Sequence, residues 1–359
     1  MSTIINADNG SVSGSAGLKQ SSDASGILEL QATTGVVTLE NNTGALTLPK
    51  GTTAQRPASP ISGMTRFNTT LANPEWYDAA TSSWLQFSTP GGYAIQYLVI
   101  AGGGAGGTNG GGGGAGGYRS SVIGEFSGGG LTVEPTVQAS TGTTYGIIVG
   151  AGGTGGPYFT TGTNGSNSEF GNIISTGGGR GGGETLNAAV GYSGGSGGGG
   201  GYLNAAGGNG TSGQGFAGGA STFGSAGAYG GGGGAGAVGE TPATNKGGNG
   251  GIGVQSTING TATYRAGGGA GGHQANTVVG TGGTGGGGNG GNNTTAGAGT
   301  ANTGGGGGGA SGGPGVSANG GSGIVILRYL GAQRGSGGTV TSASGYTVHT
   351  FTSSGTFTA

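Results

Sequence analysis

Apolar residues in this chain occur in short alternating runs near both ends and are sparse in the long middle. Near the N-terminus three runs recur every nine residues, at 26–30 (GILEL), 35–39 (GVVTL) and 44–48 (GALTL). Alternation of this kind is typical of a half-buried strand, and the glycine between runs permits a tight turn. Three such strands are too short to bury their apolar faces alone. We therefore expect residues 1–49 to be a β-repeat attachment or shaft region that intertwines in a homotrimer, packs on a neighbouring protein, or forms a meander within one domain.

Residues 50–94 have an ordinary composition and predict a small β module. A strand at residues 64–68 follows a turn rich in proline and glycine, and residues 75–78 and 83–87 are expected to pair as a hairpin. Trp76, Tyr77 and Trp84 lie on this hairpin. Such aromatics form either a platform that binds sugars or the core of a small domain, and we favour the core.

This stretch resembles a small module of tail-fibre and other virion proteins of tailed bacteriophages. The motif GTTAQRP (51–57) is followed in order by SGMTRFN (62–68), EWYD (75–78) and SSW (82–84). The resemblance is confined to this module and implies a virion protein with a short hairpin here.

Two apolar runs, at residues 97–101 (YLVIA) and 323–329 (GIVILRY), enclose a glycine-rich body at 95–330. Both runs predict β-strands. Between them, glycine runs such as 102–117 and 303–313 are separated by short segments that hold apolar or aromatic residues. A flexible linker is the simplest interpretation of glycine runs. Their total length and the apolar residues between them argue against it.

An ordered alternative is polyglycine II, an extended left-handed helix with three residues per turn and no internal hydrogen bonds. Without side chains, such helices pack closely enough to exchange N–H···O=C bonds. Each bond contributes about 0.5–1.5 kcal/mol net, which offsets the additional entropy that glycine loses on ordering, about 0.5–1 kcal/mol. Many helices must therefore cooperate. We expect a mostly β chain with a polyglycine II sandwich and negligible α-helix, and the long glycine runs break the Gly-X-Y period of collagen.

Composition and charge exclude several classes of function. Glycine supplies 106 of the 359 residues, and the formal net charge is −1. The ten basic residues are scattered, so the clustered positive charge that binds nucleic acid or an anionic membrane is missing. Without cysteine the chain has neither a disulfide framework nor a thiolate metal site. No apolar stretch approaches a membrane span, and the first residues lack the pattern of a secretory signal.

Enzyme signatures are weak. The run YLVIA followed by Gly102, Gly104 and Gly107 imitates the dinucleotide-binding fingerprint. That site requires a helix next, and the glycine run that follows is unfavourable for a helix. His273 and His349 lie far apart in the sequence and have no neighbouring carboxylates. We therefore expect no metal site, no catalytic residue and no cofactor.

The glycine-rich body as a whole is similar to the glycine-rich domain at the distal ends of phage tail fibres and adhesins. The segments YLVIAGGGAGG (97–107), TYGIIVGAGGTGG (144–156) and GSGIVILRY (321–329) carry the resemblance, in this order. It implies a sandwich of polyglycine II helices whose end loops vary and bind the host surface.

Recognition would then depend on the residues that interrupt the glycine, because glycine has no side chain to contact a ligand. Aromatic rings beside Asn, Thr and Gln suit sugars or the loops of outer-membrane proteins. The receptor-binding candidates are Tyr118, Tyr158, Phe159, Tyr202, Phe216, Phe223, Tyr229, Tyr264 and His273. The alternative is that these side chains cover the edges of the glycine core.

Residues 331–359 form a C-terminal β-strand segment that ends in GYTVHTFTSSGTFTA (345–359). This resembles a strand pair that usually precedes the YLVIA strand in related glycine-rich domains, whereas here it follows the domain. We expect it to fold back beside residues 97–101 within the same oligomer. The alternative is head-to-tail strand donation to another subunit.

These observations predict a non-enzymatic virion protein, a tail fibre or distal adhesin that is assembled in the host cytoplasm and is extracellular after release. Its expected partners are a host surface glycan or outer-membrane protein, other tail or baseplate subunits, and further copies in a homotrimer. We expect neither nucleic-acid binding nor membrane insertion. Two other non-enzymatic functions stay open: a self-assembling filament or coat without a specific receptor, and ice binding.

Overall fold

The computed structural model describes residues 48–71, 73–87, 92–157, 160, 162–184, 189–222, 227–243, 246–274, 278–292, 295–311 and 316–359. Within these ranges the regular elements are β-strands and two short 3-10 turns, and no α-helix occurs. This confirms the mostly β fold class. The nine-residue repeats expected in residues 1–49 lie outside the described residues, apart from Leu48 and Pro49.

The small module, the described residues of 48–87, is a four-stranded sheet. Its elements are β1 (Lys50–Gly51), the 3-10 turn η1 (Thr53–Gln55), β2 (Thr65–Asn68), β3 (Asn73–Asp78) and β4 (Ser83–Gln86). The strands pair in sequence order, β1 parallel to β2 and the others antiparallel. The pairing of β3 with β4 confirms the predicted hairpin.

The centre of the small module is polar. Its buried side chains are all polar or charged: Arg66, Asn68, Asn73 and Glu75. Trp76, Tyr77 and Trp84 are only half-buried, so the expectation that these aromatics form the core is wrong. One sheet without a second layer cannot enclose bulky rings. It can enclose a carboxylate that neighbouring side chains satisfy.

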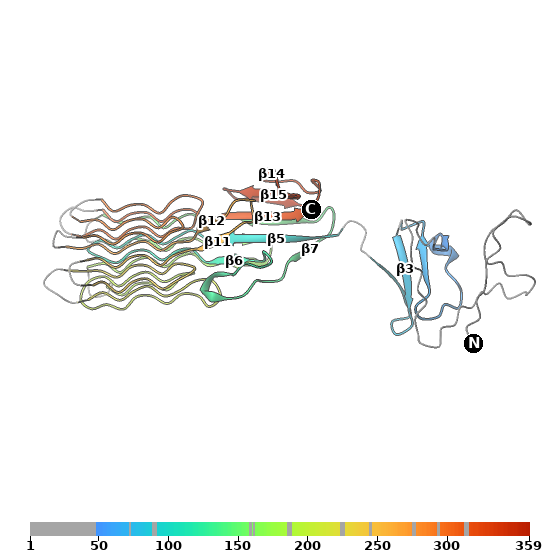
Figure 1. Ribbon diagram of the computed structural model, residues 1–359, viewed down its shortest axis with the longest axis horizontal. Helices are drawn as coiled ribbons and strands as arrows, with labels where there is room; N and C mark the ends of the chain where they lie inside the picture. Colours follow the sequence, from blue (N-terminus) through green and yellow to red (C-terminus); the bar gives the residue numbers. More distant parts are fainter. Residues whose placement is uncertain are drawn as a thin grey trace, which may run out of the picture.

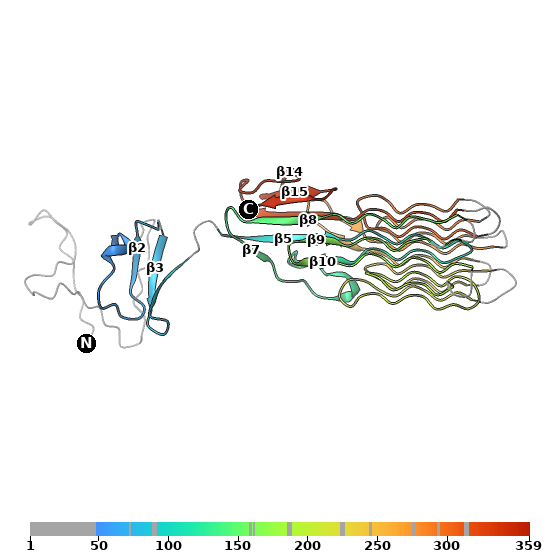
Figure 2. The ribbon, with the colours of Figure 1, turned by 180° about the vertical axis from the view of Figure 1, so that it is seen from behind.

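Residues 92–359 contain two further sheets (Figures 1 and 2). The larger has the order β14-β15-β13-β5-β6, with β7 also paired to β5, and the smaller has the order β10-β9-β8-β16. The strands of the larger sheet are β5 (Tyr93–Ile100), β6 (Tyr118–Ser120), β7 (Val137–Ala139), β13 (Ile324–Leu330), β14 (Thr339–Ala343) and β15 (Tyr346–Phe351). Those of the smaller are β8 (Thr144–Ile148), β9 (Ser168–Phe170), β10 (Ile173–Ser175) and β16 (Gly355–Thr358). A separate ribbon consists of β11 (Val254–Ser256) and β12 (Thr263–Arg265), and η2 (Gly128–Gly130) is a 3-10 turn.

β5 and β13 are buried on both faces. In β5, Tyr97 and Val99 pack with Phe170 in one hydrophobic core, and Leu98 and Ile100 belong to a second core. Successive side chains of a strand point to opposite faces, so a continuous apolar run suits a strand that is covered on both sides. The two apolar runs that enclose the glycine-rich body are therefore the central strands of the larger sheet.

The C-terminal segment closes the sheets of its own chain. β15 pairs with β13 from Val325↔Phe351 to Leu330↔Tyr346, and β16 pairs with β8. Phe351 and Phe357 are buried in the core that holds Tyr97. The expected position directly beside residues 97–101 is wrong, because β5 pairs with β13 at one edge and with β6 at the other.

The glycine-rich segments extend from the sheets and run side by side (Figure 1). We call glycine bundle the described residues of 101–117, 150–157, 162–167, 176–253 and 266–323. Backbone hydrogen bonds in the glycine bundle repeat every three residues. In segment 102–107, the first and fourth N–H groups donate to segment 163–166, the second and fifth to 318–321, and the third and sixth to 111–114. Each segment is therefore bonded sideways in three directions.

An interior segment of the bundle has six neighbours. Residues 111–116 donate to segments 179–182, 230–233 and 304–307, and they accept from residues in 104–107, from 196 and 199, and from 269, with N···O distances of 2.8–3.0 Å. All six residues are buried. Five of them are glycine, so backbone groups rather than apolar side chains hold this interior together.

Close approach explains why these positions are glycine. At Gly113 an added Cβ would lie 2.6 Å from the carbonyl carbon of Gly104 and 2.7 Å from the carbonyl oxygen of Ala105, whereas ordinary contacts begin at 3.4 Å. A side chain at this position would separate the two segments.

Side-chain oxygens complete the hydrogen bonding where a bundle segment lacks a backbone neighbour. The Oδ1 atom of Asn164 accepts from the backbone N–H of Arg180 at 3.0 Å, and that of Asn249 accepts from Thr281 at 2.9 Å. Unsatisfied buried backbone groups are costly. Asparagines between the glycine runs therefore terminate the lateral hydrogen bonding at the edge of the bundle.

Candidate receptor-binding surface

The glycine bundle has two ends. The chain leaves β5 along residues 101–107, turns at 108–110 and returns along 111–117 to β6. This turn lies at the end remote from the sheets, which is the left end in Figure 1. We call it the far end, and the opposite end beside β6, β11 and β12 the near end.

Contacts between turns hold the far end together. Thr108 forms a bridge with Ala310, and its Oγ1 donates to the carbonyl oxygen of Thr160 at 3.0 Å. The Nδ2 atom of Asn109 donates to Oε2 of Glu184 at 2.9 Å. Residues distant in sequence thus form one surface.

Tyr202 is the described candidate that is both at the far end and exposed. Its backbone N–H donates to Gly183, next to Glu184, and 37 % of the residue is exposed. Leu203 and Asn204 follow with φ angles of 62° and 53°. This left-handed region is unfavourable for residues with a Cβ, above all for Leu, and such strain concentrates at functional sites.

Two other candidates at the far end are buried. Ala228 forms bridges with Thr222 and His273, and the N–H of Tyr229 donates to Gly272. Tyr229 and His273 are both almost completely inaccessible. Burial holds the pKa of His273 below its ordinary value. In this conformation both side chains are part of the bundle interior and have no surface to offer a receptor.

The remaining described candidates lie at the near end. Tyr118 is buried in β6, and burial, followed by the charge of Glu125, raises its pKa. Phe216 is half-buried, with its ring close to Gly130 of η2. Tyr264 in β12 is 43 % exposed. The structure does not bring these residues together with Tyr202.

Tyr158, Phe159 and Phe223 lie outside the described residues. The described neighbour Thr160 contacts Thr108 at the far end.

The sequence pattern did not indicate the aliphatic residues at the far end as candidates for binding. Besides Leu203, the exposed ones are Val190, Val278 and Val316. Val190 and Val316 each stand beside one glycine and Val278 is followed only by Val279, so no hydrophobic periodicity marks these positions. These residues lie at the same end of the bundle as Tyr202 and the hydrogen-bonding side chains of Thr108 and Asn109, and they give the far end a mixed apolar and polar surface.

The described residues hold neither a metal-binding cluster nor a membrane-spanning helix. No three His, Asp or Glu side chains among them come close enough to share a metal ion. The parts of the chain that the structure describes also contain no helix capable of spanning a membrane. Aromatic, aliphatic, amide and hydroxyl groups together suit reversible binding.

A family model described as a glycine-rich domain matches residues 79–330. The chain belongs to this family. The match to the glycine-rich domain begins in the β3–β4 turn and ends at the last residue of β13. It leaves out β14, β15 and β16, although these strands complete both sheets of this glycine-rich domain. A search of curated proteins found no match. The family description does not mention phage fibres, so the resemblance to them stays a prediction.

Proposed function

We propose that this protein is a bacteriophage tail fibre or distal adhesin that binds the host cell surface through the far end of its glycine bundle. Its ligand would be a surface glycan or a loop of an outer-membrane protein. Residues 1–49 and the small module would join it to other tail or baseplate subunits in a homotrimer. On this proposal the protein is a non-enzymatic virion component, assembled in the host cytoplasm and extracellular after release.

The observation that carries the proposal is the turn at Tyr202. The bundle consists mostly of straight glycine segments. At this turn, in contrast, an exposed ring is followed by two residues other than glycine that adopt left-handed φ angles. Exposed Val190 lies on the same end of the bundle. Rigid aromatic surface beside polar groups is typical of binding sites for glycans and protein loops. The resemblance of residues 97–107, 144–156 and 321–329 to phage fibre domains supports the same function.

We further propose that the bundle segments are polyglycine II helices. A hydrogen-bond direction that repeats every three residues is what a helix with three residues per turn requires. Six lateral neighbours agree with hexagonal packing of such helices. A crystal structure should give φ near about −75° and ψ near about +145° through segment 102–107. Dihedral angles of ordinary β-strands in that segment would contradict this assignment.

Cell binding by matched tyrosine variants tests the adhesin proposal. Purified full-length protein is labelled and incubated with cells from a panel of Gram-negative strains, and binding is measured by flow cytometry. Tyr202→Ala should weaken binding at least about tenfold if the ring is an anchor of the interface. Tyr264→Ala removes a similarly exposed tyrosine at the near end and should leave binding unchanged.

Three results would contradict far-end recognition. The first is an equal loss of cell binding in Tyr202→Ala and Tyr264→Ala. The second is unchanged cell binding in Tyr202→Ala and in the alanine variants of Tyr158, Phe159 and Phe223. The third is the absence of binding to every strain. Circular dichroism melting of each variant distinguishes lost contacts from unfolding. Negative-stain microscopy separates short trimeric fibres from the long polymers of a filament protein.

A further inference from the structure

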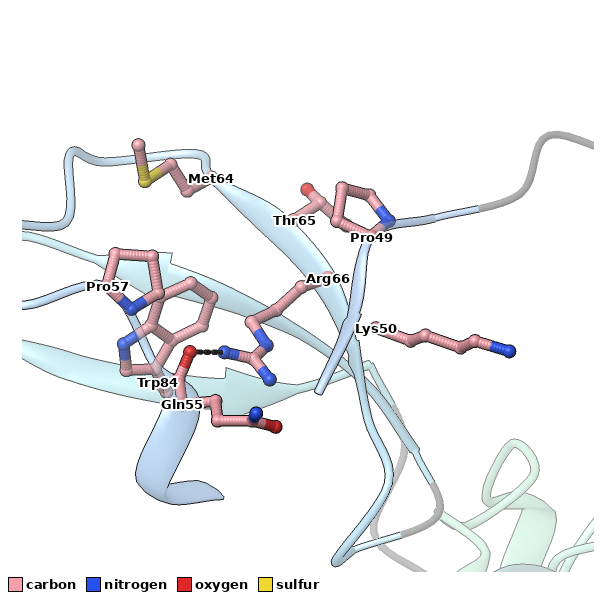
Figure 3. Close-up of a pocket in the computed structure, with 8 residues that line it drawn as sticks. All are labelled: Pro49, Lys50, Gln55, Pro57, Met64, Thr65, Arg66 and Trp84. Carbon is pink, nitrogen blue, oxygen red and sulfur yellow. Dashed lines mark hydrogen bonds between the residues drawn. The ribbon is translucent and has the colours of Figure 1, made fainter. Parts of the chain in front are cut away.

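The small module contains a cavity that the proposed far-end site does not involve. It has a volume of about 320 Å³ and opens beside Trp84 (Figure 3). Its lining combines apolar and polar side chains: Pro49, Lys50, Gln55, Pro57, Met64, Thr65, Arg66 and Trp84. Ligand pockets usually measure about 300–1,000 Å³. This cavity therefore has room for one small ring.

Trp84 is fixed in place at the wall of this cavity. The ring of Tyr77 packs on it, with centroids 5.6 Å apart and an interplanar angle of 53°. The guanidinium carbons of Arg56 and Arg66 each lie 5.9 Å from the centroid of the Trp84 ring. A ring held on several sides loses little entropy when a ligand stacks against it. Pro57 and Met64 flank the same hollow (Figure 3).

The charges around the cavity do not balance. Arg56 and Arg66 share one carboxylate, Glu75: Nη2 of Arg56 lies 2.7 Å from Oε2, and Nε of Arg66 lies 3.4 Å from Oε1. Lys50 adds a positive charge at the rim, although its side chain points away from Trp84 (Figure 3). Among the described residues, no carboxylate lines the cavity. Two arginines and one glutamate leave a surplus positive charge behind the Trp84 ring.

Polar groups at the cavity are also held in position. Arg66 donates from Nη1 to the carbonyl oxygen of Gln55 at 2.6 Å and from Nη2 to that of Thr52 at 3.0 Å. Gly51 allows this, because a Cβ there would come within 2.8 Å of Nη2 of Arg66. The GTTAQRP motif thus places a rigid cation next to an aromatic ring.

We propose that this cavity binds one residue of an acidic polysaccharide, a sugar ring that carries a carboxylate or phosphate. The apolar face of the sugar stacks on Trp84, and its anionic group lies on the side of Arg66. The side-chain amide of Gln55, which also lines the cavity, supplies a hydrogen-bonding group for its hydroxyls. A stacking surface combined with a surplus guanidinium charge favours an anionic sugar over a neutral one. This site is independent of the far end and belongs to a different part of the chain.

Fluorine NMR on full-length protein labelled with 5-fluorotryptophan tests the proposal. The two tryptophans, Trp76 and Trp84, give two resonances that single Trp→Phe variants assign. Trp84 in β4 pairs with Tyr77 in β3, so these two side chains share one face of the sheet. Trp76 directly precedes Tyr77 and therefore lies on the opposite face, which makes it the internal control. Glucuronic acid should shift the Trp84 resonance in a saturable way and leave the Trp76 resonance unchanged. Glucose should need at least about tenfold more ligand for the same shift.

Cyclohexanecarboxylate, which has the charge and ring size without the hydroxyls, separates a sugar site from a general anion site. Binding as tight as that of glucuronic acid would overturn the sugar assignment. No shift with glucuronic acid or with glucose 1-phosphate, or equal shifts at Trp76 and Trp84, would overturn the site itself.

A pair of isosteric variants tests the charge argument without disturbing the fold. Met64 is exposed at the rim, so Met64→Glu and Met64→Gln should both fold. We expect glucuronic acid to bind at least about fivefold more weakly to Met64→Glu than to Met64→Gln, because a nearby like charge repels it. Glucose should not distinguish them. Equal affinity of glucuronic acid for the two variants would overturn the role of the surplus positive charge.

Discussion

Replacing a single interior glycine tests whether backbone packing holds the glycine bundle together. Gly113 lies in segment 111–116, is fully enclosed and bonds to segments on several sides: its N–H donates to Gly307 and its carbonyl oxygen accepts from Gly269, both at 2.8 Å. In Gly113→Ala the new Cβ would lie 2.6 Å from the carbonyl carbon of Gly104. Neither atom belongs to a flexible side chain, so the two segments must separate until the distance reaches at least 3.4 Å.

The cost follows from the hydrogen bonds between these segments. Gly104 donates to Gly114 at 2.8 Å and Gly107 donates to Gly111 at 2.9 Å. Separation stretches both bonds beyond bonding distance, and we take the cost of leaving their buried groups unsatisfied as about 1–3 kcal/mol for each lost bond. Alanine regains about 0.4–1 kcal/mol by restricting the unfolded chain. We expect a net destabilisation of about 2–5 kcal/mol, and a fall in Tm of about 5–15 °C for a domain of this size.

Gly146→Ala in β8 is the matched control. A Cβ at Gly146 meets no atom within 4 Å, so this variant gains the same entropy without a collision and should be neutral or slightly stabilised. Tm is measured for both variants by circular dichroism and differential scanning calorimetry. Hydrogen exchange of the glycine amides should accelerate throughout the bundle in Gly113→Ala alone. Equal Tm values for the two variants would refute the conclusion that backbone contacts determine the stability of the bundle.

Three further changes test other parts of the structure. Glu75→Gln leaves the buried guanidinium of Arg66 without its counter-charge and should destabilise the small module by about 3–5 kcal/mol. Tryptophan fluorescence measures the unfolding of this module directly, because both tryptophans lie in it. An unchanged unfolding transition would contradict the ion pairing. Burial lowers the pKa of His349 from its ordinary 6.5. The unfolded chain therefore binds the proton more readily, and stability should fall as the pH drops from about 6.5 towards the depressed value. Urea titrations at pH 7 and pH 5 should show a smaller difference in unfolding free energy for His349→Gln than for the unaltered protein, and an identical difference would argue against this residue. Deleting residues 340–359 removes β15 and β16 from the two sheets, and we expect insoluble protein; soluble, folded protomers would show that the sheets do not need these strands.

The sequence predicted those elements that side chains specify. The runs YLVIA and GIVILRY are continuous and apolar, and they form β5 and β13, which are buried on both faces. The hairpin of β3 and β4 was also predictable because turn residues separate its strands. The lateral order of the bundle segments was not, because a glycine donates and accepts in the same way whichever segment lies beside it.

The site candidates show the same limit. A lone aromatic residue between glycine runs looks alike in sequence whether it lies inside or outside, so the burial of Tyr118, Tyr229 and His273 could not be read from their neighbours. Glu75 was missed as the centre of the small module for a related reason. In EWYD the carboxylate stands beside two aromatics, and hydrophobicity alone assigns the interior to them.

Because each interior segment exchanges backbone hydrogen bonds with six neighbouring segments, the bundle needs another source for its correct register. Along a glycine run, a segment that slides by three residues meets its neighbours with the same donors and acceptors, so slipped arrangements differ little in energy. A side-chain core penalises such errors at once, since each position has its own shape. Here the correct register must come from residues that are not glycine: β5 and β13, which pair residue by residue from Ile324↔Ile100 to Arg328↔Gln96, and the asparagines that meet one particular N–H. The β-sheets therefore align the glycine segments as well as anchor them, and their assembly is expected to precede correct packing of the bundle.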